Sequence, residues 1–331
     1  MKKIIKRILI LIIILIIAAA ALWAAAYFHR SDPKNIIQYE TTNPFINGTT
    51  QISAHRSGSG IMPEETLMAF ENCVKNDSFS VDFFEFDLHI TKDNVLVLLH
   101  DDELDRTSDS ETVFGETGVR PENKTYEELR TLNMGAKFVN EAGEMPYADL
   151  HGADVPDNLK ILSLDAILDY LTAHDDYNYI IEVKNEGDLG KKSVDLLYAT
   201  LKERDLLDKV IFGCFISEIS EYADDTCPGM IRSAYPSEVS EFYFASLFNR
   251  SDYEPEFKVL QIPFASAKDS YYVNLGTARV INYAHKHNLA VQYWTVNKEE
   301  HMEYLIRLGA DCIISDYPDK LYSVRESLDS E

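Results

Sequence analysis

The feature that most restricts the fold of this chain is a regular alternation between short apolar runs and amphipathic helical patterns. Short runs rich in apolar and β-branched residues predict strands, and apolar residues spaced three and four apart predict helices. The predicted strands are residues 51–55, 83–90, 95–99, 178–184, 210–215, 230–235, 258–263, 289–296 and 311–315. The predicted helices are residues 65–76, 125–132, 163–173, 276–287 and 299–308. Such alternation indicates an α/β fold with a parallel sheet.

A closed (β/α)8 TIM barrel is the architecture that this pattern favours. The barrel needs eight strands and the pattern offers nine, so we expect one of residues 230–235 and 258–263 to be a loop segment. A doubly wound open sheet is the alternative, but it usually places a glycine-rich phosphate turn after its first strand. The first predicted strand here ends instead in the charged pair His55-Arg56.

The length of 331 residues suits one large domain, which we place at residues 49–325 with a short tail at 326–331. Residues 101–160 fit neither periodicity, because they are rich in Asp, Glu, Gly, Asn and Thr. We predict that they form a small insertion after the third strand. Loops at that end of a barrel carry substrate contacts.

The N-terminal segment differs in composition from the rest of the chain. Ile8 to Phe28 is an uncharged run of 21 residues, long enough to cross a bilayer core of roughly 30 Å. Four basic residues precede this run, which favours a cytoplasmic N-terminus. We therefore predict that residues 1–30 are a basic cytoplasmic end plus a transmembrane anchor, that residues 31–48 are a polar stalk, and that the large domain at 49–325 is extracytoplasmic. A cleaved signal peptide, which would give a secreted protein, is the alternative.

Charge and cysteine content exclude several classes of partner. The formal net charge of −24 argues against nucleic-acid binding, and an anionic substrate would need a bound cation nearby. Four scattered cysteines suit neither a disulfide framework nor a zinc site. Cys73 and Cys312 are predicted to be buried thiols, whereas a Cys214–Cys227 disulfide and the oligomeric state stay open.

Two predicted strands carry acidic residues on an otherwise apolar background. Glu85 and Asp87 alternate with phenylalanines and so share one face of residues 83–90. Glu182 and Lys184 share a face of residues 178–184 in the same way. Three carboxylates suit one hard cation such as Ca²⁺ or Mg²⁺, and Lys184 suits a phosphate oxygen. A solvated strand face, or a purely structural Glu182–Lys184 pair, is the alternative interpretation.

Two histidines lie where apolar strands end. His55 follows the first predicted strand and His100 follows the third, so a barrel would bring both to its catalytic face. Histidine exchanges protons near neutral pH, and the planar guanidinium of Arg56 matches phosphate oxygens, although an ion pair with a loop carboxylate is also open to Arg56. With the acidic residues between them, these side chains predict a metal-dependent phosphodiesterase.

Six motifs along the chain, in order, resemble those of the glycerophosphodiester phosphodiesterases. They are residues 54–60 together with 63–66, Glu85-Phe86-Asp87, residues 100–107, Glu182-Val183-Lys184, residues 294–297 and residues 313–318. The resemblance covers about residues 51–320, which is nearly everything after the apolar N-terminal run.

The resemblance implies a TIM-type barrel with one divalent cation, Ca²⁺ or Mg²⁺, held by Glu85, Asp87 and Glu182. It implies that His55 and His100 act as acid and base. It also implies release of an alcohol from glycerol 3-phosphate, with first attack on phosphorus by the neighbouring hydroxyl of the substrate.

Two positions depart from the family pattern, because Ser57 replaces a usual glycine and Glu65 replaces a usual asparagine. Ser57 is expected to narrow the approach of the backbone to the substrate. Glu65 is expected either to add charge near the site or to lie in the first turn of a helix, where acids are favoured.

Other residues are predicted to support the site from its edges. Glu64 is expected to orient the His55-Arg56 loop, and Trp294 to line the glycerol pocket or to pack in the core. Phe244, Tyr271 and Tyr272 are aromatic residues of the later loops that would shape an apolar mouth.

Three functions remain open at this point. The first is an anchored glycerophosphodiesterase that acts on lipid-derived diesters or on a glycerophosphate polymer. The second is a phospholipase D-like enzyme of the same barrel type that acts on lysolipids. The third, from another class, is a catalytically inactive surface binding module.

Overall fold

The computed structural model describes residues 2–264 and 273–330, and its body is the predicted parallel barrel. The barrel strands are β1 (Gln51–Ala54), β2 (Phe83–Ile90), β4 (Asn178–Val183), β5 (Val210–Gly213), β6 (Ile231–Arg232), β7 (Val259–Pro263), β8 (Ala290–Trp294) and β9 (Cys312–Ser315). Their order around the sheet is β6-β5-β4-β2-β1-β9-β8-β7. An isolated bridge between Ser233 and Val259 joins β6 to β7, and the Ala234 N–H donates to the Val259 carbonyl at 2.9 Å.

The ninth strand lies outside the barrel, which corrects one prediction. Residues 230–235 and 258–263 both contribute barrel strands, and the additional strand is β3 (Leu96–Leu98), which runs antiparallel to β2. A turn with Asn94 at a positive φ of 65° reverses the chain between β2 and β3. Hydrophobic periodicity carries no information on strand direction, so the sequence pattern could not identify this hairpin.

The hairpin has a consequence for the site, because β3 leads the chain back towards the middle of β2. Leu98 lies opposite Leu88, and the next residue, Leu99, donates its N–H to the Asp87 carbonyl at 3.1 Å. His100 therefore follows a strand that descends to the level of Asp87, rather than the end of a parallel barrel strand.

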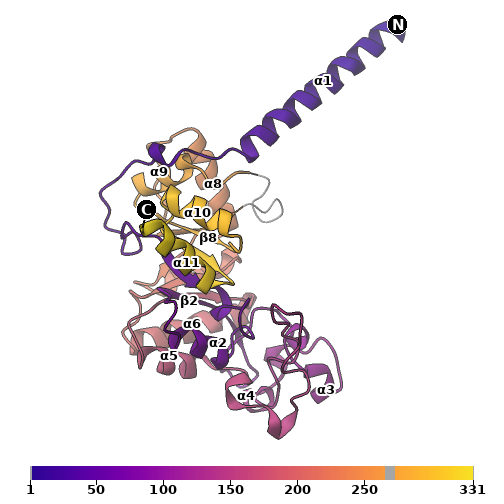
Figure 1. The fold of residues 1–331 in the computed structure, drawn as a ribbon, viewed down its shortest axis with the longest axis vertical. Coiled ribbons are helices and arrows are strands. Elements are labelled where there is room, and N and C mark those ends of the chain that lie inside the picture. Colours follow the sequence, from indigo (N-terminus) through magenta and orange to yellow (C-terminus); the bar gives the residue numbers. More distant parts are fainter. Residues whose placement is uncertain (1, 265–272, 331) are drawn as a thin grey trace.

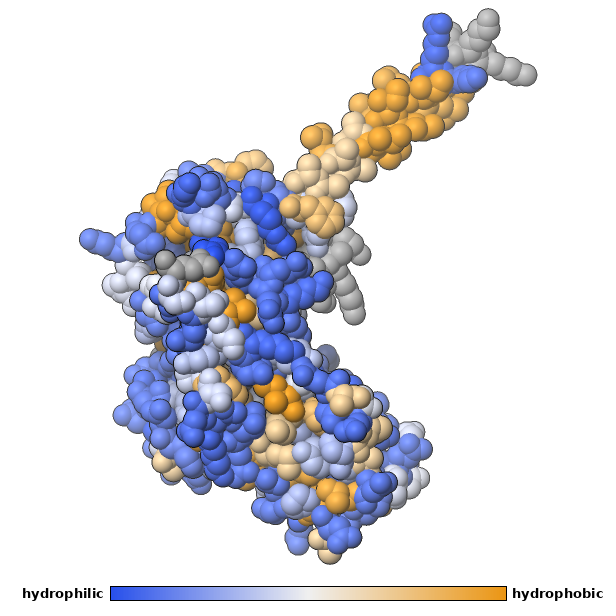
Figure 2. Space-filling view, viewed as in Figure 1, coloured by the Kyte–Doolittle hydropathy of each residue, from blue (hydrophilic) through white to orange (hydrophobic). Residues whose placement is uncertain are grey.

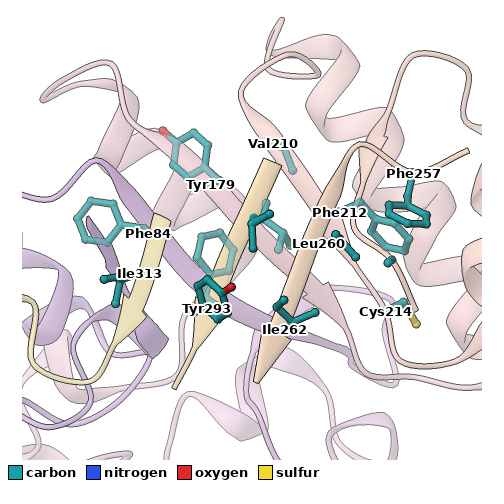
Figure 3. Packing of buried hydrophobic residues seen from close by; sticks show 14 of the residues in the cluster. Phe84, Tyr179, Val210, Phe212, Cys214, Phe257, Leu260, Ile262, Tyr293 and Ile313 are labelled. Atoms are coloured by element: carbon teal, nitrogen blue, oxygen red, sulfur yellow. The ribbon is translucent and has the colours of Figure 1, made fainter. Parts of the chain in front are cut away.

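Helices surround the barrel, and apolar side chains fill the layer between them and the strands. These helices are α2 (Leu67–Val74), α5 (Leu164–Thr172), α6 (Gly187–Glu203), α7 (Ser217–Thr226), α8 (Pro236–Leu247), α9 (Ala278–Lys286), α10 (Glu299–Leu308) and α11 (Pro318–Asp329). Figure 3 shows part of this layer, where Tyr179, Phe212 and Tyr293 leave the outer faces of three strands. All four cysteines are free and buried, as predicted for Cys73 and Cys312, and burial raises the pKa of Cys73 to about 12.

The insertion at residues 101–160 packs beside the barrel as a small lobe, seen at the lower right of Figure 1. It contains α3 (Ser110–Phe114), α4 (Tyr126–Leu129) and several short 3₁₀ turns. Thr125 and Glu128 form a capping box at the start of α4. Leu104, Leu129 and other insertion residues pack against Val97 and Leu99 of the β3 segment in a cluster of their own.

A third apolar cluster fills the lumen of the barrel at the end away from the strand carboxyl ends. It includes Phe83, Ile180 and Val259 from the strands, and Phe45 from the segment that precedes β1. Phe45 is only 2% exposed and its ring centroid lies 5.9 Å from that of Phe83. The nearby Asn43 amide donates to the Lys258 carbonyl at 2.8 Å, so the chain just before β1 is fastened to the barrel.

Helix α1 (Lys2–Tyr27) projects away from the barrel as a single rod (Figure 1). Its segment Ile5–Tyr27 is 23 residues long and none of its most apolar stretch is buried. Figure 2 shows the apolar surface of this rod in orange. Its length and composition fit a membrane span, and a signal sequence has the same properties.

Candidate active site

A cavity of about 150 Å³ opens at the carboxyl end of the barrel strands. Strand carboxyl ends are where TIM-barrel enzymes build their active sites. The structure brings all of the predicted site residues except Glu64 to the wall of this cavity. They are His55, Arg56, Glu85, Asp87, His100, Glu182, Lys184 and Trp294.

The register of β2 and β4 places the acidic residues side by side. Asp87 lies opposite Glu182, and both face the lumen because their neighbours along each strand point outwards. Lys184 Nζ lies 3.0 Å from Asp87 Oδ1 and 2.7 Å from Glu182 Oε1. Burial acts to lower the pKa of Lys184, but these two carboxylates outweigh it and raise that pKa.

Glu85 and Asp87 are buried together and differ in their electrostatic balance. Burial and the charge of Asp87 raise the pKa of Glu85 to about 7, although the Arg56 N–H donates to Glu85 Oε2 at 2.7 Å. Burial also acts to raise the pKa of Asp87, but the positive charges of Lys184, His100 and Arg56 lower it overall. Three carboxylates are thus gathered at the wall of the cavity, beside the two cationic side chains Arg56 and Lys184.

The donor set at this point fits a hard divalent cation. Glu85, Asp87 and Glu182 supply oxygen atoms from one side of the cavity, and Asp87 Oδ2 accepts no hydrogen bond from any described residue. No three His, Cys, Asp or Glu side chains within residues 2–264 and 273–330 form a ready-made cluster of ligands. The Lys184 ammonium lies between the carboxylates of Asp87 and Glu182. These two carboxylates would therefore reorient when a divalent cation binds.

His55 is held by a carboxylate that follows the last barrel strand. Its Nδ1 lies 2.5 Å from Asp316 Oδ1, and Asp316 also accepts hydrogen bonds from Ser59 Oγ and Asn297 Nδ2, both at 2.6 Å. Burial acts to lower the pKa of His55, yet Glu85 and Asp316 raise it overall. Because a carboxylate only accepts, Nδ1 carries the proton and Nε2 is left for chemistry.

His100 has the same kind of partner. Its Nδ1 lies 2.7 Å from Asp101 Oδ1, and Arg106 Nε donates to Asp101 Oδ2. Arg106 also forms a bidentate pair with Glu64, at 2.7 and 2.8 Å, and Arg56 contacts Glu64 at 3.4 Å. A chain of ion pairs therefore joins the two histidine loops. Glu64 is the middle member of this chain and lies outside the cavity.

One wall of the cavity is apolar. Trp294 lies edge-on to Phe215, with ring centroids 5.8 Å apart, and Phe215 is 52% exposed at the cavity mouth. Pro236, Val239 and Pro263 continue this wall. The cavity thus has a charged side that suits a phosphate group and an apolar side that suits carbon atoms.

Four more residues are predicted at the edges of the site, and neither of the two that the structure describes lines this cavity. Glu65 is not a first-turn helix acid, because α2 begins at Leu67 after the cap Thr66; Glu65 is buried and accepts the Asp87 N–H at 2.7 Å. Phe244 lies on the outside of α8, 60% exposed and away from the cavity wall. Tyr271 and Tyr272 lie outside the described residues.

Comparison with known proteins identifies the family. The sequence profile of the glycerophosphoryl diester phosphodiesterase family matches residues 55–320. The chain belongs to this family. The match begins at His55, includes every predicted site residue and ends shortly after Asp316.

Relatives that bear the name of the family agree with this assignment. The chain is 27% identical over 285 residues to a glycerophosphodiester phosphodiesterase of Bacillus subtilis (strain 168), covering 82% of this chain and 85% of the relative. It is 28% identical over 275 residues to a glycerophosphodiester phosphodiesterase of Caldanaerobacter subterraneus subsp. tengcongensis, covering 83% and 97%.

Solved structures of family members share the fold. A putative glycerophosphoryl diester phosphodiesterase from Silicibacter pomeroyi superposes with a TM-score of 0.65 at 20% identity, covering 86% of this chain and 95% of that one. An Oleispira antarctica phosphodiesterase, solved with the product sn-glycerol-3-phosphate, superposes with a TM-score of 0.61 at 21% identity, covering 84% and 97%.

The acidic partners of the two histidines were not predicted as functional residues. Asp101 and Asp316 each lie within a quoted family motif, but the sequence gives no distance between Asp316 and His55, which are 261 positions apart. A usable signal was present, because Asp316 directly follows an apolar strand as His55 does. Arg106, which links Asp101 to Glu64, carried no such signal.

Proposed function

We propose that this chain hydrolyses glycerophosphodiesters to glycerol 3-phosphate and an alcohol, with His55 and His100 as the acid–base pair. The observation that carries the proposal is the shared geometry of the two histidines. Each has its Nδ1 on a carboxylate, and both line one cavity with three acids and two cations. The family match and the product complex of the Oleispira antarctica relative support this substrate class.

In this proposal Glu85, Asp87 and Glu182 hold one divalent cation, Ca²⁺ or Mg²⁺. When bound, the cation would polarise a phosphoryl oxygen and reduce the repulsion between the buried carboxylates and an anionic substrate. The two local cations, Arg56 and Lys184, then face the remaining phosphate oxygens.

Proton transfer is assigned to the two imidazoles. The Nε2 atom of one imidazole takes the proton of the neighbouring substrate hydroxyl as that hydroxyl attacks phosphorus. The other imidazole, which is protonated, gives a proton to the oxygen of the leaving alcohol. The net charge of the two imidazoles is unchanged by this step. When water then attacks phosphorus, the second imidazole takes a proton from the water and the first gives its proton back to the substrate oxygen, so both rings return to their starting states. Asp316 and Asp101 keep each Nδ1 proton in place, so that Nε2 is the atom that exchanges.

We further propose that α1 is retained as a transmembrane anchor, with the N-terminus cytoplasmic and the barrel outside the cytoplasm. The basic residues before the apolar run support this orientation. In this arrangement residues 1–30 are the anchor, residues 31–48 connect it to the catalytic domain at 49–325, and residues 326–331 form the tail.

The test is to incubate the purified full-length chain with glycerophosphocholine and glycerophosphoglycerol, with Ca²⁺, Mg²⁺ or a chelator. We expect glycerol 3-phosphate to accumulate only with a divalent cation. No turnover of either substrate under any of these conditions would sink the proposal.

A second candidate, a phospholipase D-like reaction on lysolipids, is favoured by the apolar wall. Phe215 and Trp294 offer aromatic surface at the cavity mouth that a small polar alcohol does not need. With a lysolipid as substrate, release of a lysolipid cyclic phosphate would support this candidate. Release of glycerol 3-phosphate from glycerophosphocholine, with no turnover of the lysolipid, would support the first.

A further inference from the structure

Three large apolar side chains lie together on the outer face of α8 and its end. Phe244, Leu247 and Phe248 are 60%, 40% and 78% exposed. Their spacing of three and four residues puts them on one side of the helix. The opposite side of α8 is buried in the barrel layer, where Phe242 packs on Tyr283 with ring centroids 5.5 Å apart. This exposed set, here called the α8 face, therefore plays no part in holding the barrel together.

The α8 face continues directly onto the end of α1. Tyr243 and Leu247 share a surface hollow with Trp23, Ala26 and Tyr27 of α1. Figure 1 shows α8 at the end of the domain from which α1 leaves, and Figure 2 shows apolar surface there too. Trp23 and Tyr27 stack at 5.2 Å, in the position where aromatic residues collect at a membrane interface.

The end of α1 and the residues that follow it contact the barrel directly. The Asn274 amide donates to the Ala26 carbonyl at 3.3 Å and to the His29 carbonyl at 2.7 Å. The Arg30 guanidinium lies over the rings of Phe264 and Tyr304, at 4.8 and 4.6 Å. Because the last turn of α1 is itself bonded to the barrel, a bilayer crossed by α1 must end close to these residues.

We propose that the α8 face rests on the lipid bilayer that α1 crosses, at the depth of the headgroups and upper acyl chains. The proposal rests on the proposed membrane anchor. Aromatic and aliphatic side chains on one side of a helix are suited to this depth. Arg279, whose guanidinium lies 5.3 Å from the Tyr243 ring centre, adds positive charge for lipid phosphates beside an otherwise acidic domain.

The cavity mouth lies roughly 12–18 Å along α8 from this surface, because the α8 face is at the last turn of the helix and the cavity is at its first. Pro236, the first residue of α8, lines the cavity, and so does Pro263, which precedes the Phe264 ring under Arg30.

The experiment uses the full-length chain in lipid nanodiscs. Phe248→Cys is labelled with an environment-sensitive fluorophore, which is selective because all four native cysteines are buried. Leu189→Cys on α6 is the matched control, since Leu189 is also exposed and α6 lies away from α1 in Figure 1. Discs are prepared with ordinary or brominated acyl chains.

We expect brominated lipid to quench the probe at position 248 by about twofold and to leave the probe at position 189 unchanged. Phe244→Cys should behave as Phe248→Cys does, which guards against a local effect of one substitution. Equal quenching at the exposed control, or none at either α8 position, would overturn the proposal. Emission that depends on protein concentration and not on bromine would assign the surface to a second copy of the chain.

Co-elution of the chain with the discs tests the transmembrane anchor separately from the α8 face. Co-elution without quenching overturns the α8 surface alone. Failure to co-elute overturns the anchor and the α8 surface together, whereas turnover of soluble glycerophosphocholine would still support the proposed reaction.

Discussion

Replacement of Asp316 by asparagine tests how the site prepares His55. The substitution keeps the size of the side chain and removes the charge that faces His55 Nδ1 at 2.5 Å. Two further donors, Ser59 Oγ and Asn297 Nδ2, point at the same carboxylate, so a neutral amide would satisfy them poorly. His55 would lose both its orientation and the stabilisation of its protonated form.

The size of the effect follows from the hydrogen bond that is weakened. A hydrogen bond to a charged group contributes roughly 1.5–3 kcal/mol. If that energy is lost mainly in the transition state, kcat falls by about 10- to 150-fold, since each 1.36 kcal/mol is tenfold in rate. Asp316 is not part of the catalytic cavity wall, so KM for glycerophosphocholine should change by less than about threefold.

A matched control exists elsewhere in the barrel. Asp311 pairs with His285 at 2.9 Å and is likewise an acid beside a partly buried histidine, but it precedes β9 and lies at the other end of the strand. Asp311→Asn should alter thermal stability and leave kcat within about twofold. Initial rates on glycerophosphocholine, normalised to the folded fraction, measure both variants. The reasoning is refuted if Asp316→Asn keeps wild-type kcat, or if Asp311→Asn loses as much.

Other predictions follow from the barrel and its charges. Phe45→Ala should cost roughly 3–5 kcal/mol in urea unfolding because its ring plugs the lumen, whereas the exposed Val113→Ala should stay within about 0.5 kcal/mol; equal losses would contradict this. Lys184→Met should lower Tm in the absence of a divalent cation, because Asp87 is 1% exposed and loses the ammonium group that pairs with it. Added Ca²⁺ or Mg²⁺ should then raise the Tm of this variant more than that of the wild type. An equal rise in both proteins would count against the proposed ligand set. Glu85→Gln should raise the half-saturating cation concentration at least as much as the roughly 10–100-fold seen for outer-shell substitutions; unchanged cation dependence would remove Glu85 from the ligands.

The barrel was predictable because its signal is local. Apart from the β2–β3 hairpin, strands and helices alternate from β1 to β9, and each predicted strand is present in the structure. The hydrophobic pattern could not predict which strands pair with one another. β6 is only two residues long and still joins the barrel, while the strongly apolar β3 turns back on β2. Strand direction and barrel closure depend on contacts between distant segments, which periodicity does not record.

The residues that meet at the candidate site were predictable, whereas the contacts between them were less so. Glu85, Asp87 and Glu182 could be assigned to one face because a strand alternates with period two. His100 was assigned to the right face for an incomplete reason, since it arrives by a hairpin and not at the end of a parallel strand. The plug formed by Phe45 was missed as well, because a short polar segment gave no sign that one aromatic residue enters the lumen.

The most direct test of the central claim follows the phosphorus of glycerophosphocholine by ³¹P NMR. The wild type, His55→Gln and His100→Gln are compared in detergent with a saturating divalent cation, after circular dichroism has shown that all three are folded. The account predicts conversion of the diester to the glycerol 3-phosphate monoester by the wild type, and a fall of at least about 100-fold in each variant. Wild-type rates in either folded variant, or a phosphorus product other than glycerol 3-phosphate, would contradict it.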